Sequence, residues 1–147
     1  MGSRKHNSAE KRKSEKSKLV MARLRNVPTS PRKMRIVADL VRGMDVEKAM
    51  HVLQNTSKEA AGRLYKLVRS AVANWEVKHE GERLEDNALY IKEISVDSGR
   101  MLKRIQPAPQ GRAYRIRKRS NHVTLILGNR LAEMNQEVNE ESENNEN

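Results

Sequence analysis

The sequence predicts an α+β domain in which three helices pack on a small three-stranded antiparallel sheet, and a long β-hairpin protrudes from it. Two observations carry this prediction. Residues 88–96 and 122–127 are rich in the β-branched and aliphatic side chains that favour strands. Between them, residues 97–119 hold eight Lys or Arg and, after Asp97, no acidic residue. This segment is too long for a tight turn and too charged for a core, so we expect it to project as a ribbon from two paired strands.

A first strand is predicted from residue 20. Val20, Ala22 and Leu24 are apolar, and they alternate with positions that include Arg23 and Arg25. A period of two is typical of a strand that buries one face. This strand would complete the sheet.

The first predicted helix follows a Pro-containing turn. Ser30 is its expected N-cap and Pro31 its first helical residue, where a missing N–H costs nothing, and Gly43 supplies the C-terminal stop. The expected buried stripe comprises Ile36, Val37, Leu40 and Val41.

Two further helices follow. Asp45 is expected to cap a short helix, and Thr56 with Glu59 has the spacing of a capping box at the start of a longer one that ends near Lys78. Trp75 is expected to anchor the core. The predicted core positions are Val46, Ala49, Met50 and Leu53 in the short helix and Ala61, Leu64, Val68, Ala71, Val72 and Trp75 in the long one.

The two ends of the chain differ from its middle. Residues 1–19 are basic and Ser-rich, with too few apolar side chains to bury a surface, and we expect a disordered basic arm. Residues 131–147 hold six Glu and no Lys or Arg, and we expect a disordered acidic tail. The predicted folded domain is therefore residues 20–130.

The charge predicts a polyanionic partner. Thirty Lys and Arg against nineteen Asp and Glu give a net charge of +11, and the acidic tail means that the rest of the chain is more basic still. The positive charge is clustered in segments, which is the electrostatic pattern of nucleic-acid binding.

Catalytic and metal chemistry has little support. The four His residues do not cluster, no phosphate-binding glycine loop is present, and there is no cysteine. We expect no enzyme activity, no cofactor, no metal and no small-molecule substrate. No uncharged apolar run is long enough to span a bilayer, so we expect no membrane association and a protein inside the cell.

Three stretches carry a family resemblance: SPRKMRIVADLVRG, then SAVANWE, then DSGRMLKRIQPAPQGRAYRIRKRSNHVTLIL. Together they resemble the bacterial large-subunit ribosomal protein L-twenty-two family over roughly residues 21–130. The resemblance implies three helices on a small sheet, with a hairpin that reaches through ribosomal RNA to line the nascent-peptide exit tunnel. It implies a cytoplasmic protein of the ribosome that aids assembly of the large subunit. The implied partners are large-subunit ribosomal RNA, neighbouring ribosomal proteins and the nascent peptide.

The predicted RNA contacts lie on the arm and on the domain beside it. The resemblance implies contacts by five arm residues and by a surface of the first helix, with Asp39 as a partner for a nearby Arg. At the hairpin tip, Ala108, Pro109 and Gln110 depart from the basic residues usual in the family. The predicted RNA-binding residues are Arg23, Arg25, Ser30, Lys33, Arg35, Arg42, Arg100, Lys103, Arg104, Arg112, Arg115, Arg117, Lys118 and Arg119. The predicted tip is Gln106, Pro107, Ala108, Pro109, Gln110 and Gly111.

Two other classes of protein remain as alternatives. A general basic DNA- or RNA-binding protein would have the same charge, and the first two helices with their tight joint could form a helix-turn-helix. The strongest basic concentration lies in the hairpin and not on a recognition helix, which argues against that motif. An RNA-modifying enzyme is the third alternative, but the sequence lacks a site for it.

Overall fold

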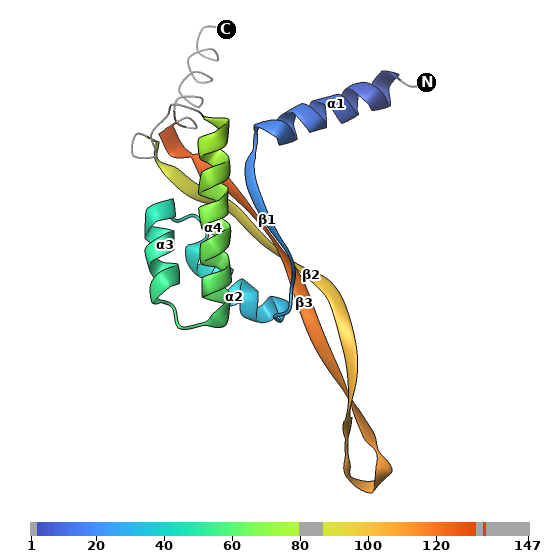
Figure 1. The fold of residues 1–147 in the computed structure, drawn as a ribbon. Coiled ribbons are helices and arrows are strands. Elements are labelled where there is room, and N and C mark those ends of the chain that lie inside the picture. The colour runs from blue at the N-terminus through green and yellow to red at the C-terminus, as the bar shows by residue number, and fades with distance from the viewer. Residues whose placement is uncertain (1–2, 80–86, 132–133, 135–147) are drawn as a thin grey trace, which may run out of the picture.

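The computed structural model describes residues 3–79, 87–131 and 134, and its core is a three-stranded antiparallel sheet covered by helices (Figure 1). The strands are β1 (Val20–Val27), β2 (Leu89–Pro107) and β3 (Ala113–Asn129), in the order β1-β3-β2. The predicted α+β class is confirmed. Among the described helices, none combines the length and hydropathy of a membrane span.

Strands β2 and β3 form one continuous ladder that begins in the domain and ends in the protruding hairpin (Figure 1). Val123, Leu125 and Leu127 of β3 face the core at every second position. In β2 the buried positions shift from Leu89 and Ile91 to Ile94 and Val96, because a bulge between Ile91 and Glu93 changes the register. The predicted hairpin is confirmed, and its tip is a single turn, η1 (Pro109–Gly111).

Helix α2 (Pro31–Val41) covers β2, and its buried face corrects the predicted stripe. Ile36 and Leu40 are exposed, by 52% and 45%. Apolar side chains surround more than half of this helix, so periodicity alone allows two stripes, and contact with the sheet selects between them. The buried residues are Pro31, Met34, Val37, Ala38 and Val41. Ser30 is the N-cap residue as predicted, although its side chain makes no capping hydrogen bond.

Helix α3 (Val46–Asn55) packs against α4 (Glu59–Lys78), and α4 runs along β1. The predicted core positions of both helices are confirmed, except that Met50 and Val72 are only half-buried. Trp75 is buried and stacks on His79 with ring centroids 4.7 Å apart.

Asp45 is the N-cap residue of α3 as predicted, although its side chain makes no capping hydrogen bond and its carboxylate instead accepts one from Lys48 Nζ at 2.8 Å. The predicted capping box of α4 is wrong. Thr56 Oγ1 turns back to donate to Val52 O at 2.7 Å, and the N-cap of α4 is Lys58. Thr side chains commonly form hydrogen bonds with nearby backbone groups, and here the bond to Val52 O replaces the predicted capping box.

A fourth helix, α1 (Ser3–Lys18), corrects the prediction of an arm without structure. The shortage of apolar side chains limits burial, and every side chain of α1 that the structure describes is indeed exposed. Secondary structure depends on another property, because Lys, Arg, Glu and Ala are all strong helix formers. The predicted acidic tail lies outside the described residues, apart from Leu131 and Met134.

Candidate nucleic-acid interface

The hairpin beyond the domain is a ladder of seven residue pairs, from Met101 with Arg119 to Pro107 with Ala113. At about 3.3 Å per residue it extends roughly 23 Å. All core residues lie outside it, so nothing in the hairpin contributes to the hydrophobic core of the described residues.

Directly paired residues share a face of the ribbon, and this divides the hairpin's cations into two groups. We call one side the cationic face: it carries Lys103, Arg115, Arg117 and Arg119. We call the other the mixed face: it carries Leu102, Arg104, Tyr114, Ile116 and Lys118.

The positive charges of the cationic face repel one another and are not neutralised by described acidic side chains. Lys103 and Arg117 are direct cross-strand partners, and like charges in that position destabilise a sheet. None of the hairpin's Lys or Arg forms an ion pair with an acidic side chain in the described part of the chain. A polyanion laid along this face would remove the repulsion.

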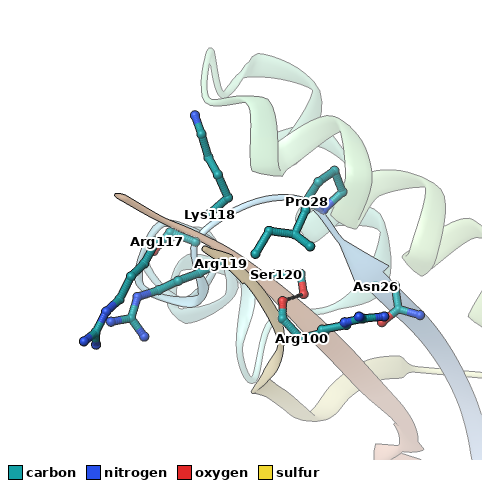
Figure 2. Close-up of a pocket in the computed structure, with 9 residues that line it drawn as sticks. Asn26, Pro28, Arg100, Arg117, Lys118, Arg119 and Ser120 are labelled. Carbon is teal, nitrogen blue, oxygen red and sulfur yellow. Dashed lines mark hydrogen bonds between the residues drawn. The ribbon is translucent and has the colours of Figure 1, made fainter. Parts of the chain in front are cut away.

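A groove of about 590 Å³ opens where the hairpin leaves the domain (Figure 2). Figure 2 shows Arg117 and Arg119 pointing to one side of the strand and Lys118 to the other, as their alternation requires. Leu102 and Pro28 add apolar surface. The combination of cations with apolar walls suits a nucleotide, which presents a phosphate and a flat base. The lining residues are Asn26, Pro28, Ser30, Arg100, Leu102, Arg117, Lys118, Arg119 and Ser120.

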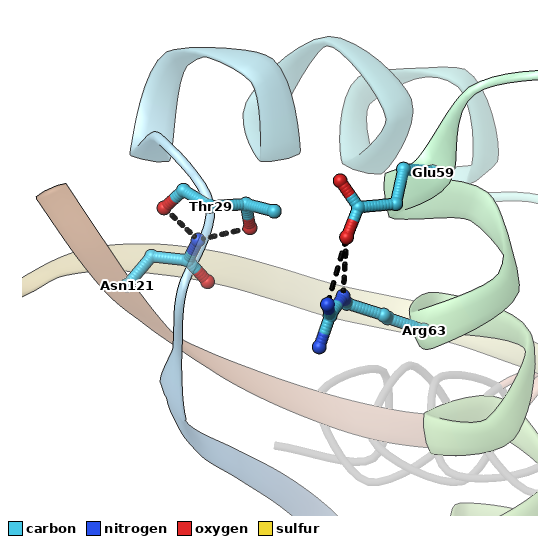
Figure 3. Close-up of polar contacts among 4 residues, drawn as sticks. All are labelled: Thr29, Glu59, Arg63 and Asn121. Atoms are coloured by element: carbon cyan, nitrogen blue, oxygen red, sulfur yellow. Dashed lines mark hydrogen bonds and ion pairs between the residues drawn. The ribbon is translucent and has the colours of Figure 1, made fainter. Parts of the chain in front are cut away.

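Asn121 holds this groove to the domain, and the sequence reasoning missed it (Figure 3). Its side-chain amide is fully buried and donates to Thr29 O at 2.7 Å and to Thr29 Oγ1 at 2.9 Å. The turn before α2 is thereby fixed to the base of the hairpin. A signal was present, because the alternation through Val123 and Leu125 places Asn121 on the buried face.

Two predicted arginines, Arg35 of α2 and Arg42 at its C-cap, have partners within the protein. Arg35 donates to Val96 O at 2.9 and 3.2 Å, and Arg42 donates to Ile94 O at 3.1 Å. These carbonyls lie on the open edge of β2, which a native sheet must cover. Arg42 also pairs with Asp39 at 2.7 Å, so the predicted partner role of Asp39 is confirmed.

The remaining predicted residues are dispersed. Lys33 is exposed beside a groove of about 370 Å³ between α2 and the start of α4. Arg23 lies near Arg63 and Lys66 in a shallow groove between β1 and α4, where Arg63 is held by Glu59 at 2.7 Å (Figure 3). Arg25 is exposed in the β1 bulge. The structure therefore brings together the hairpin and its base, and leaves these three cations apart from them.

The hairpin tip is exposed apart from the half-buried Ala108, and it carries no charge before Arg112. Gln110 and Gly111 have positive φ angles of 61° and 68°, and Ala108 N donates to Arg112 O at 2.9 Å to close the turn. The tip can therefore contact a partner only through uncharged side chains and backbone.

Two of the four histidines have structural surroundings, and His6 and His51 are exposed. His122 Nδ1 accepts a hydrogen bond from Asn26 N at 3.0 Å, and His79 stacks on Trp75. Within the described ranges, no three His, Cys, Asp or Glu side chains come together in a group that could hold a metal ion.

Known proteins match this chain over most of its length. The family model described as ribosomal protein L22p/L17e matches residues 22–128. A large ribosomal subunit protein uL22 from Christiangramia forsetii is 61% identical over 128 residues, which cover 87% of this chain and 95% of that protein. The protein of the same description from Porphyromonas gingivalis is 60% identical, over 86% of this chain and 94% of that one. That from Bacteroides fragilis is 59% identical, over 88% and 95%.

Proposed function

Because this chain belongs to the ribosomal protein L22p/L17e family, we propose that its hairpin is an RNA-binding arm that also lines the nascent-peptide exit tunnel. Family membership makes the chain a structural constituent of the large ribosomal subunit, at work in the cytoplasmic ribosome, and not an enzyme. Ribosomal RNA is accordingly its polyanionic partner. The general DNA-binding alternative is set aside.

The observation that carries the proposal is the cationic face. Four cations share one side of a ribbon that has no core of its own, and no described acid neutralises them. Structured RNA presents phosphates at high density, and its deep major groove resists side-chain readout, so a ribbon recognises it by shape and backbone contact. The cationic face supplies the phosphate contacts.

The mixed face and the groove at the hairpin base have a second role in the proposal. Tyr114 is 63% exposed, and an exposed aromatic ring provides a stacking surface for an unpaired base. At the groove, Arg100 and Lys118 would contact phosphate while Leu102 contacts a base or ribose. These residues would fix the register of the hairpin on the RNA.

The tip faces the nascent peptide in this proposal. Its residues from Gln106 to Gly111 are uncharged and, apart from the half-buried Ala108, exposed, so peptide passing in the tunnel would meet a neutral surface on this side. Neutral lining avoids the trapping of acidic segments that a basic tip would cause.

On the domain, Ser30, Lys33, Arg23 and Arg25 are proposed as additional RNA contacts. For Arg35 and Arg42 the main role is structural, because their guanidinium donors are directed to β2 carbonyls. The exposed apolar side chains Ile36 and Leu40 are the proposed contact with a neighbouring ribosomal protein, because RNA offers them little apolar surface.

Crosslinking in cells tests this proposal. The full chain and a variant without residues 97–119 would be crosslinked to RNA, and the trapped RNA sequenced. We expect crosslinks at a few sites in large-subunit ribosomal RNA, with a subset missing in the variant. Crosslinks spread over messenger RNA, or an identical set from both proteins, would contradict the proposed role of the hairpin.

A further inference from the structure

Helix α1 lies outside both the matched family region and the interface described above. It ends at Lys18, whereas the family match begins at residue 22. Figure 1 shows it extending from the end of the sheet opposite to the hairpin. The strand register agrees, because β1 starts beside Leu127 of β3 and reaches the hairpin base only at Val27. Any partner of α1 therefore lies far from the hairpin tip.

Among the described residues, one side chain forms the hydrogen bonds that hold the junction of α1 with the domain. Lys78, in the last turn of α4, donates from Nζ to Ser17 O and to Leu19 O, both at 2.7 Å. A cation at the carboxyl end of a helix is favoured by the helix dipole, so this contact stabilises the end of α1 as well as its attachment. One residue later, Val20 is buried in the core. In the described part of the chain, hydrogen bonds therefore attach α1 to the domain only at its base.

The side chains of α1 exclude most kinds of partner. It carries seven Lys or Arg against two Glu, and its only aliphatic residue is Ala9. Helices that lie in membranes or pack on protein grooves need an apolar face, and α1 has none. A polyanion remains, and for a structural constituent of the large subunit that polyanion is ribosomal RNA.

The cations of α1 form two rows. Residues seven apart on a helix lie close to one face, which groups Arg4 with Lys11, and Lys5 with Arg12; Lys16, four residues after Arg12, extends the second row. None of these cations forms an ion pair with an acidic side chain that the structure describes, since Glu10 faces His6 at 3.6 Å. At 1.5 Å per residue, α1 is about 24 Å long, which is enough to pass several phosphates.

We propose that α1 is a second RNA-binding arm, which contacts a segment of large-subunit ribosomal RNA separate from the segments bound by the hairpin. The inference rests on the proposed function and adds a second anchoring point. With one arm at each end of the sheet, the domain ties two RNA segments together and fixes its own orientation between them.

Site-directed cleavage of RNA tests the position of each arm. The chain has no cysteine, so a single introduced cysteine is the only attachment point for an iron chelate that generates hydroxyl radicals. The variants are Ser14→Cys on α1 and Gln106→Cys on the hairpin, both at exposed positions, each bound to a full-length large-subunit ribosomal RNA transcript. We expect two sets of cleavage sites that do not overlap.

The outcomes separate this inference from the function on which it rests. Cleavage from position 106 without cleavage from position 14 would overturn the role of α1 and leave the hairpin's role intact. Overlapping sets of sites would also overturn it, because α1 would then not reach a separate segment. Absence of cleavage from both positions would contradict both proposals.

A charge variant measures the contribution of α1 to affinity. Replacement of Lys11, Arg12 and Lys13 by Gln should reduce the slope of log K against log salt by about 2, at roughly 0.7 per lost phosphate contact. The matched control, Ser14→Ala with Ser17→Ala, keeps every cation and should keep the slope. An unchanged slope in the charge variant would overturn the inference.

Discussion

The domain half and the hairpin half of the β2–β3 ladder are built from the same two strands, yet their side chains have opposite surroundings. From Leu89 to Val96, β2 alternates between core and solvent, and α2 covers its outer edge. From Leu102 to Pro107 every side chain of β2 is exposed. Backbone pairing continues through both halves, so backbone hydrogen bonds do not distinguish them.

The boundary between the halves is marked by a register shift at Gly99 and Arg100. A Cβ on residue 99 would lie 2.8 Å from Ser120 Oγ and 3.1 Å from His122 Nε2, so a side chain at this position would require these neighbours to move. The Ser120 hydroxyl donates across the shift to Arg100 O. The boundary is therefore a built feature, and it separates side chains that stabilise the fold from side chains that we propose bind RNA.

Excision of the hairpin should give the largest effect. It should lower the affinity for RNA and leave the fold of the domain intact. A variant in which Asn-Gly joins Leu102 to Lys118 loses residues 103–117, and a two-residue turn fits between directly paired positions. Five cations are removed, so the salt slope should fall by about 3.5 and affinity by on the order of 100-fold. Binding is measured by titration at several salt concentrations. The core is untouched, so the variant should still unfold cooperatively on heating. Loss of that cooperative transition would show that the domain half depends on the hairpin half.

Two isoleucines of β2, one in each half of the ladder, should differ in their contribution to the free energy of unfolding. Ile94 is 2% exposed and Ile105 is 74% exposed. Ile94→Ala should lower the free energy of unfolding by about 2–5 kcal/mol, because it leaves a cavity in the core. Ile105→Ala should change it by less than about 0.5 kcal/mol. Urea denaturation measures both, and a comparable loss in the two variants would contradict the division.

A matched pair of arginines should separate structural cations from RNA-binding cations. Arg35→Gln removes the donors to Val96 O and should cost about 1 kcal/mol of stability with the salt slope unchanged. Arg117→Gln should leave stability unchanged and reduce the slope by about 0.7. If Arg35→Gln instead lowered the slope with no loss of stability, its assignment to the fold would be wrong.

Lowering the pH should produce the smallest effect, a loss of folding stability that arises in the domain half and not in the hairpin. A hydrogen bond from Lys48 lowers the pKa of Asp45, and the charges of Lys48 and Arg130 lower it further against the opposing effect of desolvation. A lowered folded-state pKa gives stability that is present above the unfolded pKa and lost as pH falls through the folded pKa, which here means below about pH 4.

Asp45→Asn tests this dependence. Thermal melts between pH 2.5 and 7 should show a smaller loss of stability with acid in the variant than in the parent chain. Identical pH profiles would show that the Asp45 carboxylate does not contribute to the pH dependence of stability.

The sequence predicted the elements well and their side-chain roles less well. Strand alternation, the long basic segment and the glycine stop at Gly43 follow from local chemistry, and all three were correct. The buried face of α2 was not, because Ile36 and Leu40 satisfy the same periodicity as the true stripe. Tertiary contact decided between the two.

The proposed RNA-binding surface shows the same limit. Charge identified the arm, but no local pattern reveals that Arg35 reaches a carbonyl sixty-one residues away, on an edge strand. Asn121 could have been noticed from its buried position in the alternation, whereas its partner Thr29 could not. For α1, the composition correctly predicted exposure and left the helix itself unforeseen.

Amide hydrogen exchange on the free and RNA-bound protein tests the division of the ladder most directly. The account predicts strong protection of residues 89–96 and 121–127 in both states, because helices cover them. Residues 101–117 should exchange rapidly in the free protein, where no core supports them, and become protected when RNA binds. Strong protection of the hairpin without RNA, or no gain of protection with it, would contradict the claim that one ladder serves as a core at one end and as an RNA-binding arm at the other.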